Sequence, residues 1–488
     1  MSSAGGNGKL VAANKHWHFI GILGSGMRAL ANYAVEGGAR VTGSDLASGN
    51  GGMRGGRPAC PAADDLLRKG VLIQNSHDNT ILSGSADLVV VSQAIGEDNP
   101  ELCHARQMGV KVMRYPELLG KLMQDQPGIA VTGSHGKSTT ASLIAHVLTA
   151  GNMDPSYVIG AHVPQLRGSS HRGKGQYLVV EACEYKRSFL HMEPKIGVVT
   201  NVDREHLDYY YDLKDIQQAF GDFAEQVKPD GAIVLNADDG NSAVLARTAT
   251  CEVVSFGMKS KTAQYRAERL WRAKKHTNFN LMCNGKNCGR FSTQLYGTHN
   301  VYNTLAAVAA LHKAGMDFDQ MREPMGEFLG AARRLQLLGE PWDVAVLSDY
   351  AHHPNEIKAS LSATRQRFPH RRIFCVFQPH QYSRTLAMMP ELADAFQDAW
   401  LTLVTDIYAA RDSAKDMQSV NAARLVQLMN HKGLTAHYVP EFRDVEDIMV
   451  GDVVPRDVVL VMGAGNIFQV AQNIVPRIEI KGRKQFAA

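Results

Sequence analysis

The chain has 488 residues, of which 44% are hydrophobic and 20% are charged, and its net charge of +4 comes from 52 basic and 48 acidic residues. At about 150 residues per domain, this length predicts about three domains. The apolar fraction excludes a disordered chain, and the near balance of charge gives no electrostatic case for nucleic acid as the main partner. No run approaches the roughly 18 apolar residues of a membrane span, which excludes an integral membrane protein.

The N-terminal residues and the cysteines both favour a cytoplasmic protein. Residues 1–13 are small, polar and glycine-rich, and they lack the apolar core of a secretory signal. The seven cysteines are irregularly spaced, and the closest pair, Cys283 and Cys288, has no second pair or nearby histidine to complete a zinc set. We therefore expect reduced thiols in a reducing compartment.

Short apolar strands alternate with glycine- or aspartate-containing turns and helical stretches along the whole chain. Strands are predicted at 18–20, 129–131, 178–180, 198–200, 344–347, 373–377 and 458–462. Nearly continuous apolar and β-branched runs are typical of parallel strands that are covered on both faces. The pattern predicts an α/β fold, and turn-rich segments at 124–128 and 330–334 indicate domain boundaries.

The first predicted strand is followed by a loop with glycine at 21, 24 and 26. Asp45 ends the next predicted strand, where an acid that binds ribose would lie in a dinucleotide-binding fold. The order of the glycines differs from G-x-G-x-x-G, the pattern of NAD-binding loops. The loop therefore favours another phosphate-bearing ligand over NAD. The alternative is a glycine turn with no ligand.

The strand predicted at 129–131 leads into a second glycine loop, Gly-Ser-His-Gly-Lys-Ser-Thr-Thr at 133–140, which opens a helix. Glycines let backbone N–H groups approach phosphate oxygens, and a helix N-terminus adds partial positive charge. Lys137 can reach the β- and γ-phosphates of a nucleotide, and the Ser138 hydroxyl can bind Mg²⁺. The loop is shorter than the ordinary phosphate-binding pattern, and a tight turn with a solvated lysine is the alternative.

Polar side chains follow several of the other predicted strands. Glu181 and His206 come after strands at the edge where open α/β sheets bind ligands, although a histidine in such a place is more often a loop or core residue. Asn300 and Asn303 share a helix face and could contact a purine, with helix capping as the alternative for Asn300. The adjacent histidines at 352–353 rarely both face one ion, so a metal site there is disfavoured.

The order and spacing of these motifs resemble those of the Mur ligase family, ATP-dependent enzymes that form the amide bonds of the peptidoglycan stem peptide. The resemblance extends from about 18 to 467 and is carried by segments at 18–27, 133–140, 181–185, 201–206, 299–303, 349–354, 377–380, 406–408 and 462–465. The Asp-Tyr-Ala-His-His-Pro run at 349–354 and the Phe-Gln-Pro-His run at 377–380, followed by Ser-Arg-Thr at 383–385, are typical of one subfamily.

The resemblance implies three α/β domains. These are a Rossmann-like domain at 1–124 that binds a UDP-sugar, a central P-loop ATPase-like domain at 125–332 with a mostly parallel sheet, and a Rossmann-like domain at 333–488 that binds an amino acid and acts as a lid. The implied substrates are UDP-N-acetylmuramate and L-alanine, joined through an acyl phosphate that forms from ATP with Mg²⁺. No residue looks like an activated protein nucleophile, which agrees with such a mechanism.

The resemblance also implies roles for individual residues. The implied catalytic residues are Lys137, Glu181, His206 and Arg334, and Ser138, Glu181 and His206 would hold Mg²⁺. ATP would contact Gly133, Ser134, His135, Gly136, Lys137, Ser138, Thr139, Asn300, Asn303, Arg334 and Asp349. The UDP-sugar would contact Gly21, Gly24, Ser25, Gly26, Asp45, Ser92, Asn99, His380 and Arg384.

Several positions depart from the family pattern. Ser134 and Ser138 replace threonines but keep a hydroxyl, Leu335 replaces an aromatic residue beside the arginine, and Ser348 replaces an acid. The stretches 48–56, expected to be a mobile loop, and 167–174 have no counterpart and receive no function.

Three other functions stay open. They are a recycling ligase that joins a whole peptide to UDP-N-acetylmuramate, a dinucleotide-dependent oxidoreductase, and a UDP-sugar binding protein without activity. The oxidoreductase leaves the second glycine loop unexplained, and Lys137, Glu181 and His206 argue against an inactive protein.

Overall fold

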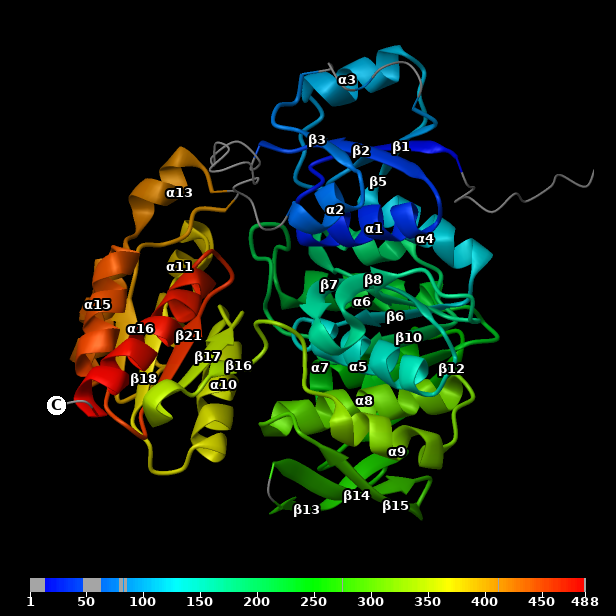
Figure 1. Ribbon diagram of the computed structural model, residues 1–488. Helices are drawn as coiled ribbons and strands as arrows, with labels where there is room; N and C mark the ends of the chain where they lie inside the picture. The colour runs from blue at the N-terminus through cyan, green and yellow to red at the C-terminus, as the bar shows by residue number, and fades with distance from the viewer. Residues whose placement is uncertain are drawn as a thin grey trace, which may run out of the picture.

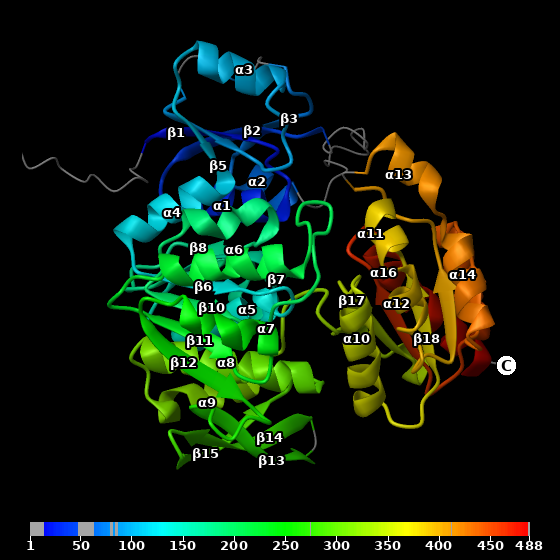
Figure 2. The same ribbon diagram turned by 180° about the vertical axis from the view of Figure 1, so that it is seen from behind.

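The computed structural model describes residues 14–46, 63–78, 82, 86–273, 275–410 and 412–486, so the stretch 48–56 lies outside the described residues. They form three α/β domains, each built on its own sheet. The N-terminal and central domains are stacked, and the C-terminal domain stands to one side of them (Figures 1 and 2). None of the described helices is both long enough and apolar enough to cross a membrane.

The N-terminal domain is a five-stranded parallel sheet in the order β3-β2-β1-β4-β5. Its elements are β1 His16–Ile20, α1 Ser25–Glu36, β2 Arg40–Ser44, α2 Asp64–Arg68, β3 Leu72–Gln74, β4 Leu88–Val91, α3 Pro100–Gln107, β5 Val112–Arg114 and α4 Tyr115–Asp125. The strand order changes direction between β1 and β4, so a crevice is expected at their carboxyl ends, which lead into Gly21 and Ser92.

A buried polar network lies inside this domain and connects β1, β2 and α3. His18 places Nε2 2.7 Å from Glu101 Oε1 and Nδ1 2.8 Å from the Thr42 hydroxyl, and Ser44 donates a hydrogen bond to Glu101 Oε2. His18, Ser44 and Glu101 expose no surface. Because buried polar groups must find partners within the protein, this network fixes the three elements relative to one another.

The central domain contains a ten-stranded sheet in the order β15-β14-β13-β12-β11-β10-β6-β9-β7-β8. Its strands are β6 Gly128–Thr132, β7 Ser156–Val163, β8 Gly168–His171, β9 Leu178–Glu181, β10 Ile196–Val199, β11 Ala232–Asn236, β12 Glu252–Gly257, β13 Tyr265–Ala273, β14 His276–Cys283 and β15 Lys286–Thr293. Its helices are α5 Lys137–Ala150, α6 Leu213–Gln226, α7 Gly240–Ala243, α8 Thr298–Lys313 and α9 Phe318–Glu327, with 3₁₀ turns at Pro164–Leu166, Tyr185–His191 and Val244–Arg247. Strands β13 to β15 form an antiparallel meander at the end away from the N-terminal domain (Figure 1).

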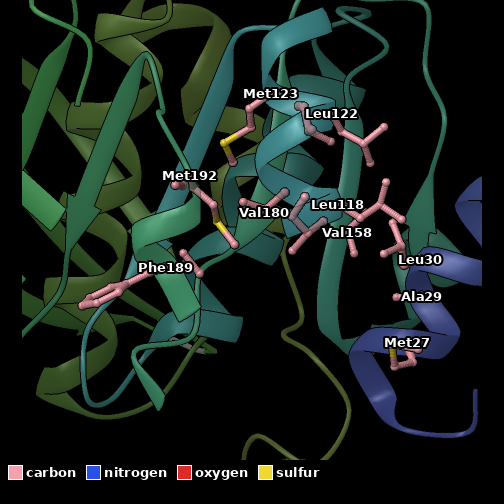
Figure 3. Packing of buried hydrophobic residues seen from close by; sticks show 14 of the residues in the cluster. Met27, Ala29, Leu30, Leu118, Leu122, Met123, Val158, Val180, Phe189 and Met192 are labelled. Carbon is pink, nitrogen blue, oxygen red and sulfur yellow. The ribbon is translucent and has the colours of Figure 1, made fainter. Parts of the chain in front are cut away.

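One apolar cluster joins the first two domains. Figure 3 shows Leu30 of α1 and Leu118 of α4 beside Val158 and Val180 of the central sheet, and all four are buried in the same cluster. Helix α4 packs closely on the central domain, because a Cβ added at Gly120 would lie 1.8 Å from the carbonyl oxygen of His191 in the 3₁₀ turn Tyr185–His191. A continuous core of this kind holds the two domains together as one body.

The stretch 167–174, which has no counterpart in the family pattern, contributes to this junction. It supplies β8, which pairs antiparallel with β7, and the Arg172 N–H donates a 2.9 Å hydrogen bond to Glu36 at the end of α1. Its role in the structure is therefore to connect the central sheet to the N-terminal domain.

The C-terminal domain has a six-stranded sheet in the order β16-β17-β21-β18-β19-β20, parallel except for β16. Its elements are β16 Gln336–Gly339, a 3₁₀ turn at Pro341–Asp343, β17 Ala345–Asp349, α10 Pro354–Arg367, β18 Ile373–Phe377, α11 Tyr382–Ala387, α12 Met389–Ala393, β19 Leu401–Val404, α13 Ala414–Ser419, α14 Ala422–His431, β20 Ala436–Tyr438, α15 Phe442–Asp452, β21 Val458–Met462 and α16 Phe468–Phe486. Separate clusters cover its two faces, and among the described residues neither contains a side chain from the other domains.

The predicted fold class is confirmed, and each of the seven predicted strands falls on a strand with at least one parallel neighbour. The ends shift by one residue at Thr200 and Val344, which lie just outside β10 and β17. The sequence pattern does not indicate the meander β13 to β15, because most residues of β13 and β15 are exposed or half-buried and lack the continuous apolar runs of the covered strands.

We expect Glu101→Ala to destabilise the N-terminal domain by about 3 kcal/mol or more, because His18 and Ser44 would lose their buried partner. Thermal unfolding followed by circular dichroism measures this effect. The control is Glu97→Ala, which removes an exposed glutamate that pairs with two arginines at the surface of the same domain. Equal melting temperatures for the two variants would contradict a stabilising role for the network.

Candidate active site

The glycine loop at 133–136 connects β6 to α5 and needs glycine at both ends. Gly133 has φ of +131° and Gly136 has φ of +84°. A Cβ at Gly133 would lie 2.1 Å from the Thr200 hydroxyl, and a Cβ at Gly136 would lie 2.4 Å from the Asn303 side-chain oxygen. The loop therefore packs against the end of β10 and the start of α8 with no room for side chains.

Two of the loop's N–H groups are already bonded within the protein. Ser134 N–H donates to the Asn201 carbonyl at 3.0 Å, and His135 N–H donates to Asn201 Oδ1 at 2.9 Å. The first helical bond of α5 runs from Thr140 N–H to the Gly136 carbonyl. The donors that remain for an anion are thus those at the start of the helix, rather than those of Ser134 and His135.

Lys137 lies inside the loop and is paired with a buried acid. Its Nζ donates to the carbonyl of Gly133 at 2.6 Å and lies 2.9 Å from Glu184 Oε2. Burial opposes the charge of Lys137, but the Glu184 carboxylate outweighs it and raises the lysine pKa, while the pKa of Glu184 is lowered. The ammonium is therefore held charged at the start of α5 before any ligand is bound.

Ser138 and Glu181 form an oxygen pair next to this lysine. The Ser138 hydroxyl donates to Glu181 Oε1 at 2.9 Å, and Glu181 Oε2 accepts the Gly160 N–H at 2.9 Å. Arg334 of the C-terminal domain reaches across and donates to the Ser138 hydroxyl at 3.3 Å. Hydroxyl and carboxylate oxygens are ligands that suit Mg²⁺.

His206 is placed beside Glu184. Its Nε2 lies 3.4 Å from Glu184 Oε1, its ring is 4.9 Å from the ring of Tyr185, and its buried Nδ1 has no hydrogen-bond partner among the described residues. Donor atoms of Cys183, Glu184 and His206 all lie within 4.8 Å of one another. Loss of solvation around the sulfur, followed by the charge of Glu184, raises the pKa of the Cys183 thiol, which makes it a poor nucleophile although the residue is exposed.

A cavity of about 420 Å³ opens next to the loop, between the central and C-terminal domains. It is lined by His135, Gly136 and Thr139 of the loop and helix, by Asn300 and Asn303 of α8, and by Arg334, Asp349 and Glu356 of the C-terminal domain, among other residues. Its volume suits a nucleotide-sized ligand. The structure thus brings together residues that lie more than 200 positions apart in the sequence.

The two asparagines and the aspartate of this cavity are held in place by hydrogen bonds. Asn303 donates to Asn300 Oδ1 at 3.0 Å, and Asn300 donates to a backbone carbonyl at 2.7 Å. Asp349 accepts the N–H groups of Leu335 and Ala351 at 2.6 and 2.7 Å. Burial raises the pKa of Asp349 to about 6, against the nearby charge of Arg334.

His135 connects the loop to the C-terminal domain. Its Nδ1 lies 3.1 Å from Glu356 Oε1 at the start of α10, and its Nε2 lies 3.2 Å from Asp203 Oδ2. Burial opposes protonation of the ring, but the two carboxylates outweigh it and raise the pKa of His135 to about 10. The pKa values of Asp203 and Glu356 are both lowered. The imidazolium therefore forms a charged bridge between the domains.

A second polar contact between the domains involves Arg384, which the resemblance groups with the UDP-sugar residues. Its Nη2 donates to Glu205 Oε1 at 3.0 Å, and His352 Nε2 lies 3.6 Å from the same oxygen. Burial alone would raise the pKa of Glu205, but Arg384 and His352 hold it well below its usual value. His380 stacks on Tyr408 at 5.4 Å within the same domain.

A small cavity of about 70 Å³ lies at this contact. It is lined by Arg204, Glu205, His206, Leu207 and Asp208 of the central domain and by Gln381, Ser383, Arg384, Ala387 and Met388 of the C-terminal domain. Arg384 therefore faces the segment around His206, and its hydrogen bonds connect it to this segment and to His380 rather than to the first glycine loop.

The first glycine loop is shaped by contacts within the N-terminal domain. Gly21 has φ of +79°, and its N–H donates to the Ser44 carbonyl at 2.8 Å. Asp45 Oδ2 accepts the N–H of Leu23 at 2.9 Å, so this acid holds the loop. Gly24 directly precedes α1, which begins at Ser25 and has no side-chain cap and no acid in its first turn.

Two other residues assigned to the UDP-sugar, Ser92 and Asn99, have different positions in this domain. Ser92 follows β4 next to Gly21, since a Cβ at Gly21 would lie 3.0 Å from the Ser92 Cβ. Asn99 accepts the Leu102 N–H at 3.0 Å and caps α3. Its position is therefore explained by helix capping.

The acids Glu184, Glu205 and Glu356 were not given roles from the sequence, although each pairs with a cation of the site. Each of these glutamates lies within three residues of Glu181, His206 or His353 in the sequence. This proximity to a motif is the signal that could have marked them as site residues. The adjacent histidines have different partners: His353 accepts the Asn355 N–H and caps α10, whereas His352 faces Glu205.

Comparison with known proteins finds family models along most of the chain. They are "Mur ligase family, catalytic domain" at 16–127, "Mur ligase middle domain" at 131–311 and "Mur ligase, glutamate ligase domain" at 333–465. The chain is 37% identical over 463 residues to the UDP-N-acetylmuramate–L-alanine ligase of Alkaliphilus metalliredigens, covering 94% of this chain and 97% of that one.

Solved structures of related ligases also resemble this chain. The UDP-N-acetylmuramate-alanine ligase of Thermotoga maritima matches with a TM-score of 0.80 and 26% identity, over 96% of this chain and 99% of that one. A murein peptide ligase of Psychrobacter arcticus matches with a TM-score of 0.69 and 22% identity, over 96% of this chain and 99% of that one. This match shows similarity of fold alone.

We expect the contact between the central and C-terminal domains to weaken in alkali. Because the pKa of His135 is raised from 6.5 to about 10, the stabilisation from its charge is complete below about pH 6.5 and is lost as pH rises through about 10. Small-angle scattering should show a larger radius of gyration near pH 10 than at neutral pH.

The variant Glu356→Gln should show the larger radius at neutral pH already, with a smaller further change in alkali. Glu391→Gln, on α12 of the same domain, serves as the matched control. A radius that stays constant across this pH range in the wild-type protein would contradict the charged bridge.

Proposed function

The chain belongs to the Mur ligase family, and from this we propose that it is a UDP-N-acetylmuramate–L-alanine ligase, which uses ATP to form an amide between the muramyl carboxylate and L-alanine. The recycling ligase that adds a whole peptide has weaker support, because the peptide ligase structure is less similar than the alanine ligase structure. The observation that carries the proposal is the charged Lys137 at the start of α5, beside a cavity that two domains share.

The central residues suit phosphoryl transfer. When ATP enters, Lys137 can exchange its Glu184 contact for the phosphates, because both partners are already charged and buried. Arg334, which reaches Ser138 from the C-terminal domain, is placed to neutralise charge on the γ-phosphate. Asn300 and Asn303 would contact the adenine side of the nucleotide, and Asp349 the ribose hydroxyls.

The reaction then needs no protein nucleophile. A muramyl carboxylate oxygen attacks the γ-phosphorus, and the bond to the bridging oxygen of ADP breaks. The amine of alanine next attacks the acyl carbon and displaces inorganic phosphate, losing its surplus protons to the surroundings. A closed C-terminal domain would exclude water and so protect the acyl phosphate from hydrolysis.

Ser138 and Glu181 fit a Mg²⁺ ion, because their side-chain oxygen atoms lie 2.9 Å apart and could both bind one ion. When bound there, the ion would supply positive charge to the phosphate oxygens. His206 and Glu184 form a neighbouring pair that could hold a second ion once Lys137 has moved to ATP.

The small cavity beside Arg384 suits the amino acid. Arg384 uses one terminal nitrogen for Glu205 and the other for His380, and its guanidinium would bind the alanine carboxylate by exchanging one of these contacts. Ala387 and Met388 offer apolar contacts for a methyl group.

The remaining assignments follow from the same premise. The first glycine loop and the start of α1 would bind the diphosphate of the UDP-sugar, with Ser92 beside it. We place the domain boundaries at 124/125 and 332/333. The cytoplasm suits an enzyme whose described cysteines are all free thiols.

The proposal predicts that the protein releases phosphate only when ATP, UDP-N-acetylmuramate and L-alanine are present together. With ¹⁸O in the muramyl carboxylate, one labelled oxygen should appear in the released phosphate. Mass spectrometry of the released phosphate measures whether it contains ¹⁸O. Label that stays entirely in the amide would refute the acyl phosphate, and label in AMP would indicate adenylation.

Lys137→Ala should lower kcat by at least about a hundredfold with an unchanged fold, because the start of α5 would lose its charge on the transferring phosphate. Lys121→Ala, on the exposed side of α4, is the matched control and should keep full activity. The assignment fails if a folded Lys137→Ala keeps more than about a tenth of the activity, which corresponds to less than about 1.4 kcal/mol in the barrier.

A further inference from the structure

Arg334 lies in a strained turn that leads from the central domain into β16. The residues on both sides of it have positive φ, +57° for Arg333 and +48° for Leu335. Residues with a Cβ rarely adopt this region, so the surroundings must hold both of them in it. Strain of this kind is concentrated at functional sites. The shape of the turn sets the direction in which the Arg334 side chain leaves the backbone.

The C-terminal domain supplies the hydrogen bonds that hold this turn. The Tyr350 N–H donates to the Arg333 carbonyl at 2.7 Å, and the Arg333 N–H donates to the Gln336 side chain at 2.9 Å. The Leu335 N–H donates to Asp349 at 2.6 Å. These partners belong to β16, to the end of β17 and to the residue that follows β17. The turn is therefore fixed to the C-terminal domain.

The Arg334 guanidinium has few contacts of its own. Its hydrogen bond to the Ser138 hydroxyl is 3.3 Å long and crosses the domain boundary. A single long hydrogen bond is a weak restraint on a flexible side chain. Within its own domain, the guanidinium lies over the ring of Tyr350, 5.0 Å from the ring centre. The position of Arg334 therefore depends on the turn and on this ring.

The guanidinium of Arg333 holds both of these features. It lies 4.8 Å from the ring centre of Tyr350 and 4.6 Å from that of Phe468, the first residue of α16. Its Nη2 donates to the carbonyls of Gly463 and Gly465, in the loop after β21, at 2.6 and 2.9 Å. A planar guanidinium can stack on rings and donate hydrogen bonds at the same time. Arg333 thus anchors the turn to β17, β21 and α16.

We propose that Arg333 is a positioning residue that holds the turn and the Tyr350 ring and so directs the Arg334 guanidinium towards the transferring phosphate. The inference rests on the proposed function, which gives Arg334 a part in phosphoryl transfer. Arg333 lines neither the nucleotide-sized cavity nor the small cavity, and its hydrogen bonds go to the backbone of its own domain. It therefore acts through Arg334 and not on the substrates.

Arg333→Lys keeps the charge but removes the planar group that stacks on the two rings. We expect kcat, measured as phosphate release with all three substrates, to fall at least about tenfold, since a displacement of about 1 Å can cost a hundredfold in rate. The KM values for the three substrates should change less than about twofold, because the lost effect belongs to the transition state.

Arg372→Lys is the matched control. The Arg372 guanidinium also lies over two rings, 5.1 Å from the centre of Phe374 and 4.6 Å from that of Trp400, and it pairs with Asp457. It belongs to the same domain but precedes β18, whereas the contacts of Arg333 follow β17 and β21. This variant should keep kcat within about twofold of the wild-type value, because it alters similar contacts away from the site.

Two further variants separate the side chain of Arg333 from its backbone and from other routes of action. Arg333→Gly accepts the positive φ without strain but lacks the anchor, so its kcat should fall at least as far as that of Arg333→Lys. Arg334→Ala has no guanidinium to direct. Adding Arg333→Lys to Arg334→Ala should therefore change the remaining rate less than about twofold.

The outcomes separate this inference from the proposed function. If the wild-type protein forms product and either Arg333→Lys or Arg333→Gly keeps the wild-type kcat, the positioning role is wrong and the proposed function stands. If Arg333→Lys slows Arg334→Ala as much as it slows the wild-type protein, or if Arg372→Lys loses as much kcat, Arg333 does not act through Arg334 and the assignment is overturned. If the wild-type protein releases no phosphate with the three substrates, both proposals fail.

Discussion

The charged contact of His135 with Asp203 and Glu356 is the interaction on which the arrangement of the site depends. It joins the glycine loop, the segment after β10 and the start of α10. The nucleotide-sized cavity lies next to this contact, and the small cavity lies next to the Arg384–Glu205 pair. These bridges help to hold Arg334 and Asp349 beside the loop, because the two residues belong to a domain with separate apolar cores.

The two domain junctions differ in their chemistry, and this difference explains their roles. The N-terminal and central domains share one apolar cluster, which would lose contacts throughout if the domains moved apart. The C-terminal domain meets the central domain through hydrogen bonds and ion pairs, which can exchange with water at small net cost. Under the proposed function, the first two domains would form a rigid body for the sugar nucleotide, and the C-terminal domain would act as a separable lid.

The acids of the site are paired with cations before substrates arrive. Glu184 holds Lys137, and Glu205 holds Arg384, each with a buried carboxylate. Burying such charges costs solvation energy, which the partner offsets only while it stays close. A phosphate or carboxylate ligand can therefore take over the cation without first removing water from it. Pairing of this kind prepares the site at the price of some stability in the empty enzyme.

The sequence alone determined the α/β class, the seven covered strands, both glycine loops and the family, because these features depend on local patterns of apolar residues, glycines and short motifs. The tertiary structure decided which residues meet. Arg384 contacts Glu205 across a domain boundary, and Tyr115 lies against Gly26, neither of which follows from spacing along the chain. Contacts between residues far apart in the sequence are fixed by how the sheets and domains pack, and a local pattern carries no information about that packing.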